Sequence, residues 1–531
     1  MLVRNVQSRV RTAAVAVFAL AVTFVLPAEN ARILAIETIA AKSHWNFMSA
    51  VLRSLTGGGH NVTVFTPFPK GNEENYTEVD MSDVLPVKIG MDLTSVIQDF
   101  GDARSLVSKA TEIMSVFCDM IYNDSRVIGI LAGGLDANFD AIVIEPGPAP
   151  CLTYAAAGSN LPVIYTVPMA KAFLTDNGAV RDVSNPATVS SIFSRHAVPK
   201  TFAQRFSNTL LSVYIEAYVT LQHALRRVAV KFATDRRPYD EYVPDQPSIL
   251  FTNGHYVSDA ARPIPANVVS VGGIHLKPPE KIPKDILEFI EDSPHGVVLF
   301  TFGSTVLMAS TPDHIRTAFL EALAQLPQRV LLKYEVKLRD IPNNVMVRKW
   351  FPQRDILVHF NSKAHPNVKL FISHGGISGV YEAVDAAVPV LGFPLFSDQY
   401  RNIDSLVEAG MAISMEVMSV TKDAFFNNIV ELVNNEKYKK NAKITSEVFK
   451  DRPMSPQQSV VYWTEYVIRH KGASHLKSQA VNLSWYQYFL LDVIAVVFIL
   501  ISTVSFVIYR VFKLLYQYSF KHSRVIKTKR E

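Results

Sequence analysis

Residues 32–66 read RILAIETIAAKSHWNFMSAVLRSLTGGGHNVTVFT and carry the clearest fold signal in the chain. Two short apolar runs, residues 32–38 and 61–66, suit buried β-strands, and residues 46–55 between them suit an amphipathic helix. Three glycines at 57–59 end the helix and leave only a short turn. A strand, a helix and a strand joined so closely form a β-α-β unit, which belongs to a parallel sheet.

The same alternation of strand-like and helical segments continues along the chain. Further short apolar runs lie at 141–145, 162–166, 296–302, 329–333, 345–348, 370–373 and 389–392. A chain of 531 residues exceeds one ordinary core, and the proline-rich segment 276–285 suits a linker. We therefore expect an α/β protein of two doubly wound, Rossmann-like domains, residues 29–275 and 276–455, with a cleft between them.

The two ends of the chain predict a membrane protein. Residues 1–28 combine arginines with an apolar run, as a signal peptide does; an uncleaved anchor and a buried helix are the alternatives. Residues 485–509 contain one charged residue and are long enough to cross a bilayer as a helix. The tail, residues 510–531, holds seven basic residues and one acidic residue. Its net charge of +6 exceeds the net charge of +5 of the whole chain. The basic balance therefore sets membrane orientation and gives no argument for nucleic-acid binding.

This arrangement predicts a type I single-pass protein of the endoplasmic-reticulum membrane, with its globular domains in the lumen. Lys527 and Lys529 resemble a dilysine retrieval signal, and a basic flank of the span is the alternative for them. Cys118 and Cys151 allow at most one disulfide. Three glycosylation sequons lie in the lumenal part, at Asn61, Asn75 and Asn123.

His44 and Glu145 follow two of the predicted strands, residues 32–38 and 141–145. The carboxyl ends of parallel strands meet at one edge of a sheet, so these two side chains can pair. An imidazole that a carboxylate orients is suited to act as a general base. The alternative is a histidine packed beside Trp45 and a glutamate in a surface loop.

A second group of polar residues surrounds the strand at 370–373. His374 and two glycines lead from it into a helix N-terminus, where backbone N–H groups attract phosphate. Ser378 and Glu382 lie four residues apart and share one face of that helix. An ordinary strand–turn–helix is the alternative for the glycines.

Other residues suit the remaining parts of a nucleotide-sugar: a tryptophan and an amide for a base, a glycine–serine pair for phosphate, and an Asp-Gln pair for a sugar. In chain order they are Gly303, Ser304, Trp350, Gln353, Asp398 and Gln399. The sequence has no Asp-x-Asp pair and no cysteine cluster, so we predict no metal site and no cofactor. Dinucleotide-binding and Walker glycine motifs are absent too.

Residues 371–382 read FISHGGISGVYE, and Pro389, Pro394 and the Asp-Gln pair follow. This pattern resembles the signature of the UDP-glycosyltransferase family, and within it is most similar to the animal membrane-bound branch, in particular the insect UDP-glucosyltransferases. The resemblance covers essentially the whole mature chain. It implies a GT-B fold, with the acceptor in residues 29–275, the UDP-sugar in 276–455, and the helices of 456–484 returning to the first domain.

The resemblance also implies roles for matching positions. It assigns uracil stacking to Trp350, uridine contact to Gln353, diphosphate contact to His374 beside Gly376, ribose contact to Glu382, and contact with the transferred sugar to Asp398 and Gln399. His44 matches the catalytic base of the family, and the implied reaction is a single displacement that inverts the anomeric carbon.

Three positions depart from the family pattern. Glu145 stands where the family usually has Asp, and Ser378 stands where many members have Asn. Residues 358–363 are extra, shortly after Trp350 and Gln353. The extra residues either form a surface bulge or displace Trp350, which would weaken UDP binding.

The resulting expectation is a detoxifying transferase that moves a sugar, glucose by resemblance, from a UDP-sugar to a hydroxyl of a small lipophilic acceptor. A catalytically silent family member that binds a lipid or chaperones a partner is the alternative from another class. A lumenal transferase that extends glycans is a third reading. The sequence leaves the oligomeric state, including a homo-oligomer, open.

Overall fold

The computed structural model describes residues 30–528, apart from residues 88–89, 171–179, 181–183, 241, 243–245, 360–362 and 365. The predicted signal peptide, residues 1–28, and Lys529 therefore lie outside the described residues. The chain divides into two compact units, which meet in sequence at Leu476 and Lys477.

The first sheet has seven strands in the order β3-β2-β1-β4-β5-β6-β7, and all neighbouring strands are parallel. Residues 33–36 and 141–144 are fully buried, because helices cover both faces of this sheet. The strands are β1 (Arg32–Ile36), β2 (Asn61–Thr66), β3 (Tyr76–Asp80), β4 (Ala141–Ile144), β5 (Val163–Val167), β6 (Ile249–Thr252) and β7 (Val268–Ser270).

The helices of this region include one that begins earlier than the sequence predicts. We predicted a helix over 46–55, but α2 spans Lys42–Gly57. The apolar spacing becomes regular only after its first turn, where the side chains of Lys42 and Ser43 are polar and partly exposed. The other helices are α3 (Leu93–Phe100), α4 (Ala103–Tyr122), α5 (Ser125–Ala132), α6 (Leu135–Asn138), the 3₁₀ helix η1 (Pro150–Ala156) and α8 (Phe202–Phe232).

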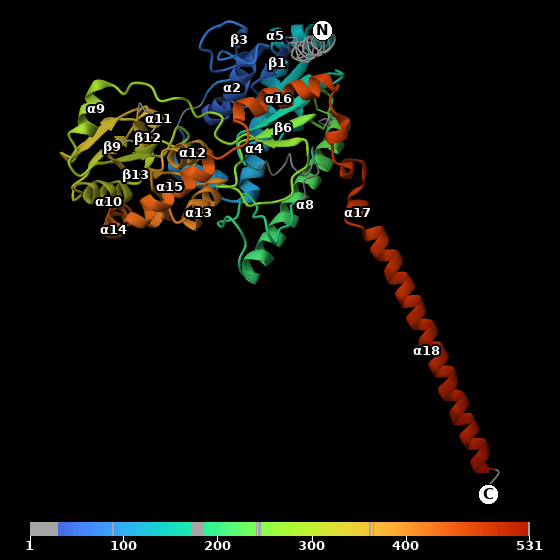
Figure 1. The fold of residues 1–531 in the computed structure, drawn as a ribbon. Helices are drawn as coiled ribbons and strands as arrows, with labels where there is room; N and C mark the ends of the chain where they lie inside the picture. The colour runs from blue at the N-terminus through green and yellow to red at the C-terminus, as the bar shows by residue number, and fades with distance from the viewer. Residues whose placement is uncertain are drawn as a thin grey trace, which may run out of the picture. The chain divides into compact units, whose positions relative to one another are not determined.

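The second sheet has six parallel strands in the order β10-β9-β8-β13-β14-β15 (Figure 1). Both sheets therefore have the doubly wound strand order. In each sheet the second and third strands are added on one side of the first strand, and the later strands are added on its other side. The strands are β8 (Val297–Thr301), β9 (Arg329–Lys333), β10 (Val345–Arg348), β13 (Val368–Ser373), β14 (Val390–Gly392) and β15 (Ala412–Ser414). The helices are α9 (Lys284–Glu291), α10 (Asp313–Leu323), α11 (Gln353–Leu357), α12 (Ile377–Asp385), α13 (Gln399–Glu408), α14 (Lys422–Asn434) and α15 (Glu436–Lys450).

The extra residues after α11 belong to a small hairpin. β11 (Val358–His359) pairs antiparallel with β12 (Lys363–Ala364), and residues 360–362 between them lie outside the described residues. Val358 is buried against the core of the second sheet.

Two segments tie the sheets together. Residues 91–100 leave the first sheet and pack on the second: the Met91 N–H donates to the Thr305 carbonyl at 2.7 Å, and Leu93 of α3 is buried beside β8. In the other direction, α16 (Pro456–Arg469) packs on α2 and β6 and buries Val460 and Val467 in the first core. These crossings hold the two sheets at a common cleft.

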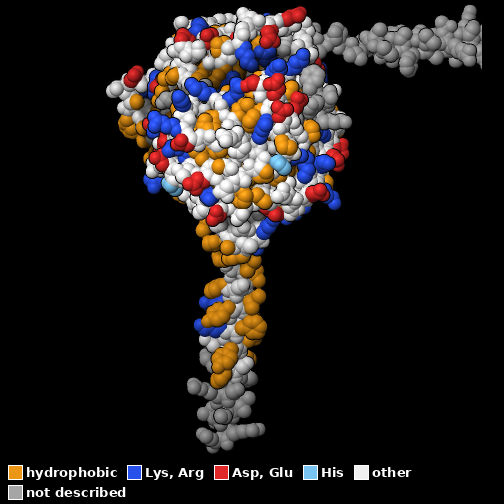
Figure 2. Space-filling view, turned by 90° about the vertical axis from the view of Figure 1, so that its left-hand side faces the viewer, with side chains coloured by type: hydrophobic (Ala, Val, Ile, Leu, Met, Phe, Trp, Pro, Cys, Tyr) orange, Lys and Arg blue, Asp and Glu red, His pale blue; other side chains and the backbone are white. Residues whose placement is uncertain are grey.

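The second compact unit contains a helix suited to a membrane. α17 (Trp485–Tyr488) precedes the long helix α18 (Leu491–Thr528), in which residues 491–520 form a candidate membrane span. The most apolar 18-residue stretch of this span has a mean hydropathy of 2.7 and is not buried. This candidate span starts later and runs further than the span of 485–509 that we predicted. Figure 2 shows hydrophobic side chains along α18 and mixed acidic and basic side chains over one face of the globular part.

The two cysteines pair: Cys118 of α4 and Cys151 of η1 form a disulfide that is fully buried in the first core. The three predicted glycosylation sites, Asn61, Asn75 and Asn123, all lie at exposed positions.

Candidate active site

The side chains of His44 and Glu145 meet at the carboxyl edge of the first sheet. β1 and β4 are adjacent and in register, with Ile36 opposite Ile144, so the residues that follow both strands lie side by side. His44 Nδ1 lies 2.6 Å from Glu145 Oε1. The Glu145 side chain is only 3% exposed, whereas that of His44 is 25% exposed and reaches the cleft. Glutamate in place of aspartate therefore still reaches the imidazole.

The electrostatics around His44 favour a basic imidazole. Burial lowers the pKa of His44, but the charge and hydrogen bond of Glu145, with a smaller contribution from Asp398, outweigh it and raise the pKa above its ordinary value. A carboxylate on Nδ1 fixes the tautomer in which Nδ1 carries the proton and Nε2 is the acceptor.

Glu37 is a buried carboxyl group beside this pair that the sequence did not single out. It follows β1 directly, is fully buried, and accepts a hydrogen bond from the Ile39 N–H at 3.0 Å. Burial, and then the charge of Glu145, raise the pKa of Glu37 well above its ordinary value. The environment of Glu37 thus disfavours its charged form, and Glu145 is the carboxyl group that contacts His44.

His374 lies between two glycines at the carboxyl edge of the second sheet. A Cβ atom at Gly303 or at Gly376 would come within 2.6 Å of the His374 ring, so neither position accepts a side chain without moving it. Gly303 also has a φ of +72°, which favours glycine. The two glycines leave room for the ring and expose the N-terminus of α12 beside it.

The His374 imidazole is neutral and lacks a partner on one side. Burial, and then the charge of Lys333, lower the pKa of His374 to about 4. Its Nδ1 atom is buried and finds no hydrogen-bond partner in the part of the chain that the structure describes. A buried unpaired nitrogen at a helix N-terminus fits an anionic ligand that would supply the missing contact.

Lys333 adds a cation to this edge and was missed from the sequence. It ends β9, next to β8, and its ammonium donates to the Gly303 carbonyl at 2.7 Å and to Glu335 at 2.8 Å. The signal was available, because its strand ends at the same edge as the glycine–serine pair; a single lysine after an apolar run was not distinctive enough to select it.

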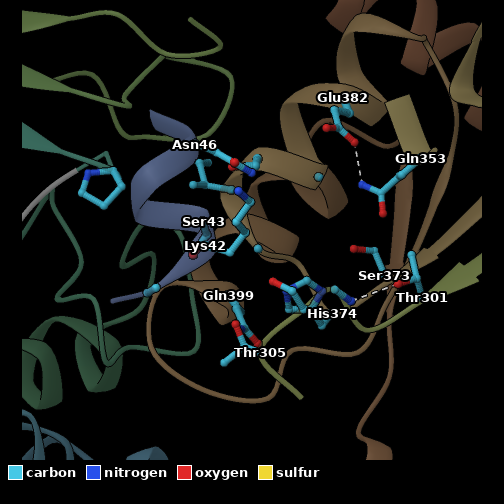
Figure 3. Close-up of a pocket in the computed structure, with 18 of the residues that line it drawn as sticks. Lys42, Ser43, Asn46, Thr301, Thr305, Gln353, Ser373, His374, Glu382 and Gln399 are labelled. Carbon is cyan, nitrogen blue, oxygen red and sulfur yellow. Dashed lines mark hydrogen bonds between the residues drawn. The ribbon is translucent and has the colours of Figure 1, made fainter. Parts of the chain in front are cut away.

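Gln353 and Glu382 form the third part of the site. The Gln353 amide donates to the Glu382 carboxylate at 2.5 Å (Figure 3). Burial raises the pKa of Glu382 to about 7, although the hydrogen bond from Gln353 and the charge of Arg354 act against it. Trp350 stands beside them with 62% of its surface exposed, so its ring is open for stacking. The hairpin after α11 does not remove Trp350 from the site.

Asp398 and Gln399 begin α13 on the side that faces His44. The Asn402 amide donates to Asp398 at 2.8 Å and fixes the carboxylate, and burial raises the pKa of Asp398. The Gln399 side-chain oxygen accepts the Leu395 N–H at 2.9 Å, so its amino group is the part that remains for a ligand. The sequence indicated the Asp-Gln pair, but it did not show that the oxygen of the Gln399 amide is used within the protein and that only its amino group is left for a ligand.

A cavity of about 330 Å³ joins the two edges. It is lined by every residue that the sequence assigned to the site except Glu145, which lies behind His44. Figure 3 shows Ser43 and Asn46 of α2 on one side of this cavity and His374, Gln353 and Glu382 on the other. The lining residues that sequence reasoning missed include Lys42, Ser43, Asn46, Pro168, Met169, Thr301, Thr305, Lys333 and Ser373.

The chemistry of this cavity is that of a site for a large anionic ligand. It offers an open aromatic ring, a buried carboxyl–amide pair, a helix N-terminus with a lysine, and a histidine with an acceptor nitrogen. Within the described ranges, no cluster of three or more His, Cys, Asp and Glu residues could hold a metal ion.

Comparisons with known proteins agree with this arrangement. The family model described as "UDP-glucoronosyl and UDP-glucosyl transferase" matches residues 31–526. UDP-glucosyltransferase 2 of Dactylopius coccus is 38% identical over 94% of this chain and 96% of its own length, and UDP-glucuronosyltransferase 2B17 of Rattus norvegicus is 29% identical over 91% and 93%. The solved glycosyltransferase VinC, in complex with dTDP, superposes with a TM-score of 0.51 at 15% identity, covering 83% of this chain and all of VinC, so the fold is GT-B.

The packing of His374 against Gly303 leads to a stability prediction. Gly303→Ala adds a Cβ that contacts the ring at 2.6 Å and places alanine at a φ of +72°. We expect a loss of about 1–3 kcal/mol in the free energy of unfolding, from the strained backbone and the displaced imidazole. Thermal unfolding of the full chain measures it.

Gly129→Ala is the matched control, because its Cβ would meet nothing within 4 Å and it lies inside α5. We expect this variant to be at least as stable as the parent, since alanine favours a helix. Equal unfolding temperatures for the two variants would mean that the glycine at 303 is not required.

Proposed function

Since this chain belongs to the UDP-glycosyltransferase family and transfers a sugar from a UDP-sugar, we propose that His44 is the general base of the transfer. The observation that carries this proposal is the 2.6 Å contact of His44 Nδ1 with Glu145 at the wall of the cavity. The contact leaves Nε2 as an acceptor, and the raised pKa of His44 makes it a stronger base.

The proposed reaction is a single displacement. The hydroxyl of the acceptor gives its proton to His44 Nε2 as its oxygen forms a bond to the anomeric carbon. The bond from that carbon to the UDP oxygen breaks on the opposite side, so the carbon inverts. Glu145 stabilises the imidazolium that forms, because it lies 2.6 Å from the other ring nitrogen.

The donor is proposed to lie along the second sheet edge. Uracil stacks on Trp350, and Gln353 with Glu382 meets the uridine and its ribose hydroxyls. The diphosphate lies at the N-terminus of α12, where His374 Nδ1 donates to it and Lys333 supplies a positive charge. Asp398 and the Gln399 amino group then face the transferred sugar, next to His44.

Glucose is the sugar that we propose, and a small lipophilic molecule with a hydroxyl is the proposed acceptor. The name of the Dactylopius coccus relative, UDP-glucosyltransferase 2, supports glucose, since its identity of 38% exceeds the 29% of the rat glucuronosyltransferase. Pro168 and Met169 supply apolar surface on the first-sheet side of the cavity, which supports a lipophilic acceptor.

We also propose that residues 29–485 lie in the lumen of the endoplasmic reticulum and that α18 anchors them as a type I protein. The candidate span at 491–520 supports an anchor. The buried Cys118–Cys151 disulfide supports an oxidising compartment, and the exposed Asn61, Asn75 and Asn123 are accessible for glycosylation there.

The first test is a panel of UDP-glucose, UDP-glucuronate and UDP-galactose against phenols, flavonoids and sterols, in microsomes that contain the full chain. We expect the highest kcat/KM with UDP-glucose. His44→Ala should lower kcat by about 10²–10⁴-fold without loss of UDP binding, because it removes the base and leaves the donor side intact.

His314→Ala is the matched control, since His314 is exposed on α10, away from the cavity. It should keep full activity. Full activity of His44→Ala would refute the assignment of the base. A parent protein that binds UDP but transfers no sugar to any acceptor would instead support a silent, lipid-binding or chaperone role.

The raised pKa of His44 predicts the pH dependence of turnover. The imidazole must be neutral to accept a proton, so kcat/KM should fall as the pH drops through the pKa of His44. That pKa lies above 6.5, the ordinary value for histidine. Glu145→Gln removes the charge that raises the pKa; burial then dominates, and the acid limb should shift to lower pH while the maximal rate falls.

The same linkage applies to stability. The interaction with Glu145 favours protonated His44, so its stabilisation is present below pH 6.5 and is lost as the pH rises through the raised pKa. The stability gap between the parent and Glu145→Gln should therefore narrow with rising pH. If Glu145→Gln left the pH dependence of kcat/KM and of stability unchanged, the pairing of His44 with Glu145 would be contradicted.

We propose that the transfer needs no metal cofactor, because the diphosphate site is built from N–H donors, His374 and Lys333. A chelator such as EDTA should leave kcat/KM unchanged in metal-free buffer. Loss of turnover that added Mg²⁺ or Mn²⁺ restores would show that the diphosphate is held through a metal.

A further inference from the structure

The outer face of α8 carries a long apolar stripe. The helix has 31 residues and is thus about 46 Å long. Nine large hydrophobic side chains spaced mainly by three and four residues are between 44% and 83% exposed on it: Phe202, Phe206, Leu210, Val213, Tyr214, Leu221, Leu225, Val228 and Phe232. Such spacing places them on one side of a helix.

The opposite side of α8 is firmly packed. Asn208, Ile215 and Val230 are buried, and the Asn208 amide donates to the Pro186 carbonyl at 2.6 Å and the Val189 carbonyl at 2.9 Å. Arg226 reaches Ser115 of α4 at 3.2 Å. The helix therefore lies against α4 with this side inward (Figure 1), and the stripe is on its outward side.

An apolar stripe of this extent marks a contact with something outside the described residues. Its form indicates the partner. The stripe is broad, since neighbours such as Val213 and Tyr214 both belong to it, whereas a pairing helix shows a narrow seam. Exposed Arg227 and Lys231 border it, and α8 carries four basic residues against one acidic residue. A broad apolar face with aromatic rings and bordering cations is typical of a helix that lies in a membrane interface.

We propose that α8 lies in the headgroup region of the bilayer, with its stripe in the lipid and Arg227 and Lys231 at the lipid phosphates. This inference rests on the membrane anchoring proposed above. The span begins at Leu491, and the fourteen residues 477–490 before it reach at most about 50 Å when extended. This tether keeps the globular part within that distance of the membrane surface, and α8 would orient its first-sheet side toward lipid, where lipophilic acceptors dissolve.

Spin labels on the full chain test this proposal. The two native cysteines are paired, so an introduced cysteine is the sole free thiol. Val213→Cys, Leu221→Cys and Val228→Cys place a label on the stripe. Gln222→Cys and Ala229→Cys are matched controls, since both are exposed, each directly follows a stripe residue, and the two lie seven residues apart on another face of the helix. Each variant must retain UDP-sugar turnover, which shows that it is folded.

The labelled proteins are reconstituted in vesicles of phosphatidylcholine and phosphatidylserine, and collisions with oxygen and with a water-soluble nickel chelate are measured by electron paramagnetic resonance. We expect the oxygen-to-nickel ratio to be several-fold higher at the three stripe positions than at the two controls. Equal ratios at all five positions would overturn the proposal, because the stripe would then face water.

Two further readouts separate the other outcomes. Dipolar coupling between labels on different molecules, at stripe positions only, would show that a second copy of the chain covers the stripe, and would overturn the lipid assignment. A label at Val497→Cys in α18 reports the anchor itself. A low oxygen-to-nickel ratio at Val497 would refute the proposed membrane anchor itself. A high ratio at Val497 together with low ratios at the stripe positions of α8 would refute only the inference about α8.

Discussion

The parallel pairing of β1 with β4, and of β8 with β13, is the constraint on which the site depends. Both pairs end in register, so the residues that follow them meet: His44 with Glu145 on one edge, and Gly303 with His374 on the other. Neither edge is complete alone. One offers a base and no anion site; the other offers an anion site and no base.

The chain therefore needs its two sheets to face each other, and several buried contacts hold them. Arg401 of α13 pairs with Asp259, which follows β6, at 2.7 Å, with both side chains largely buried. The Tyr381 hydroxyl of α12 donates to the Asn253 carbonyl at 2.9 Å. Removal of one partner of a buried ion pair costs about 3–5 kcal/mol, so these contacts oppose separation of the edges. His44 and Asp398 line the same cavity, so the two edges face each other across it.

Much of the fold could be predicted, because short apolar runs bounded by polar turns mark buried parallel strands. Four of the strand-end residues, His44, Glu145, His374 and Gly303, were identified in the same way. Part of what the sequence could not show depends on long-range packing. The contact of the Lys333 ammonium with the Gly303 carbonyl joins residues 30 positions apart, whereas the Gln399 oxygen is engaged locally, by the Leu395 N–H four residues before it. The outward stripe of α8 was missed too, because spacing defines a face but not whether that face points inward.

The most direct measurement of the central claim is an experimental structure of the full chain with UDP and an acceptor that it glucosylates. The account predicts uracil on Trp350, the diphosphate within hydrogen-bond distance of His374, and the acceptor hydroxyl within hydrogen-bond distance of His44 Nε2, with Nδ1 still on Glu145. A complex in which the acceptor hydroxyl approaches the anomeric position from a side that His44 does not reach, or in which UDP binds away from His374, would contradict it.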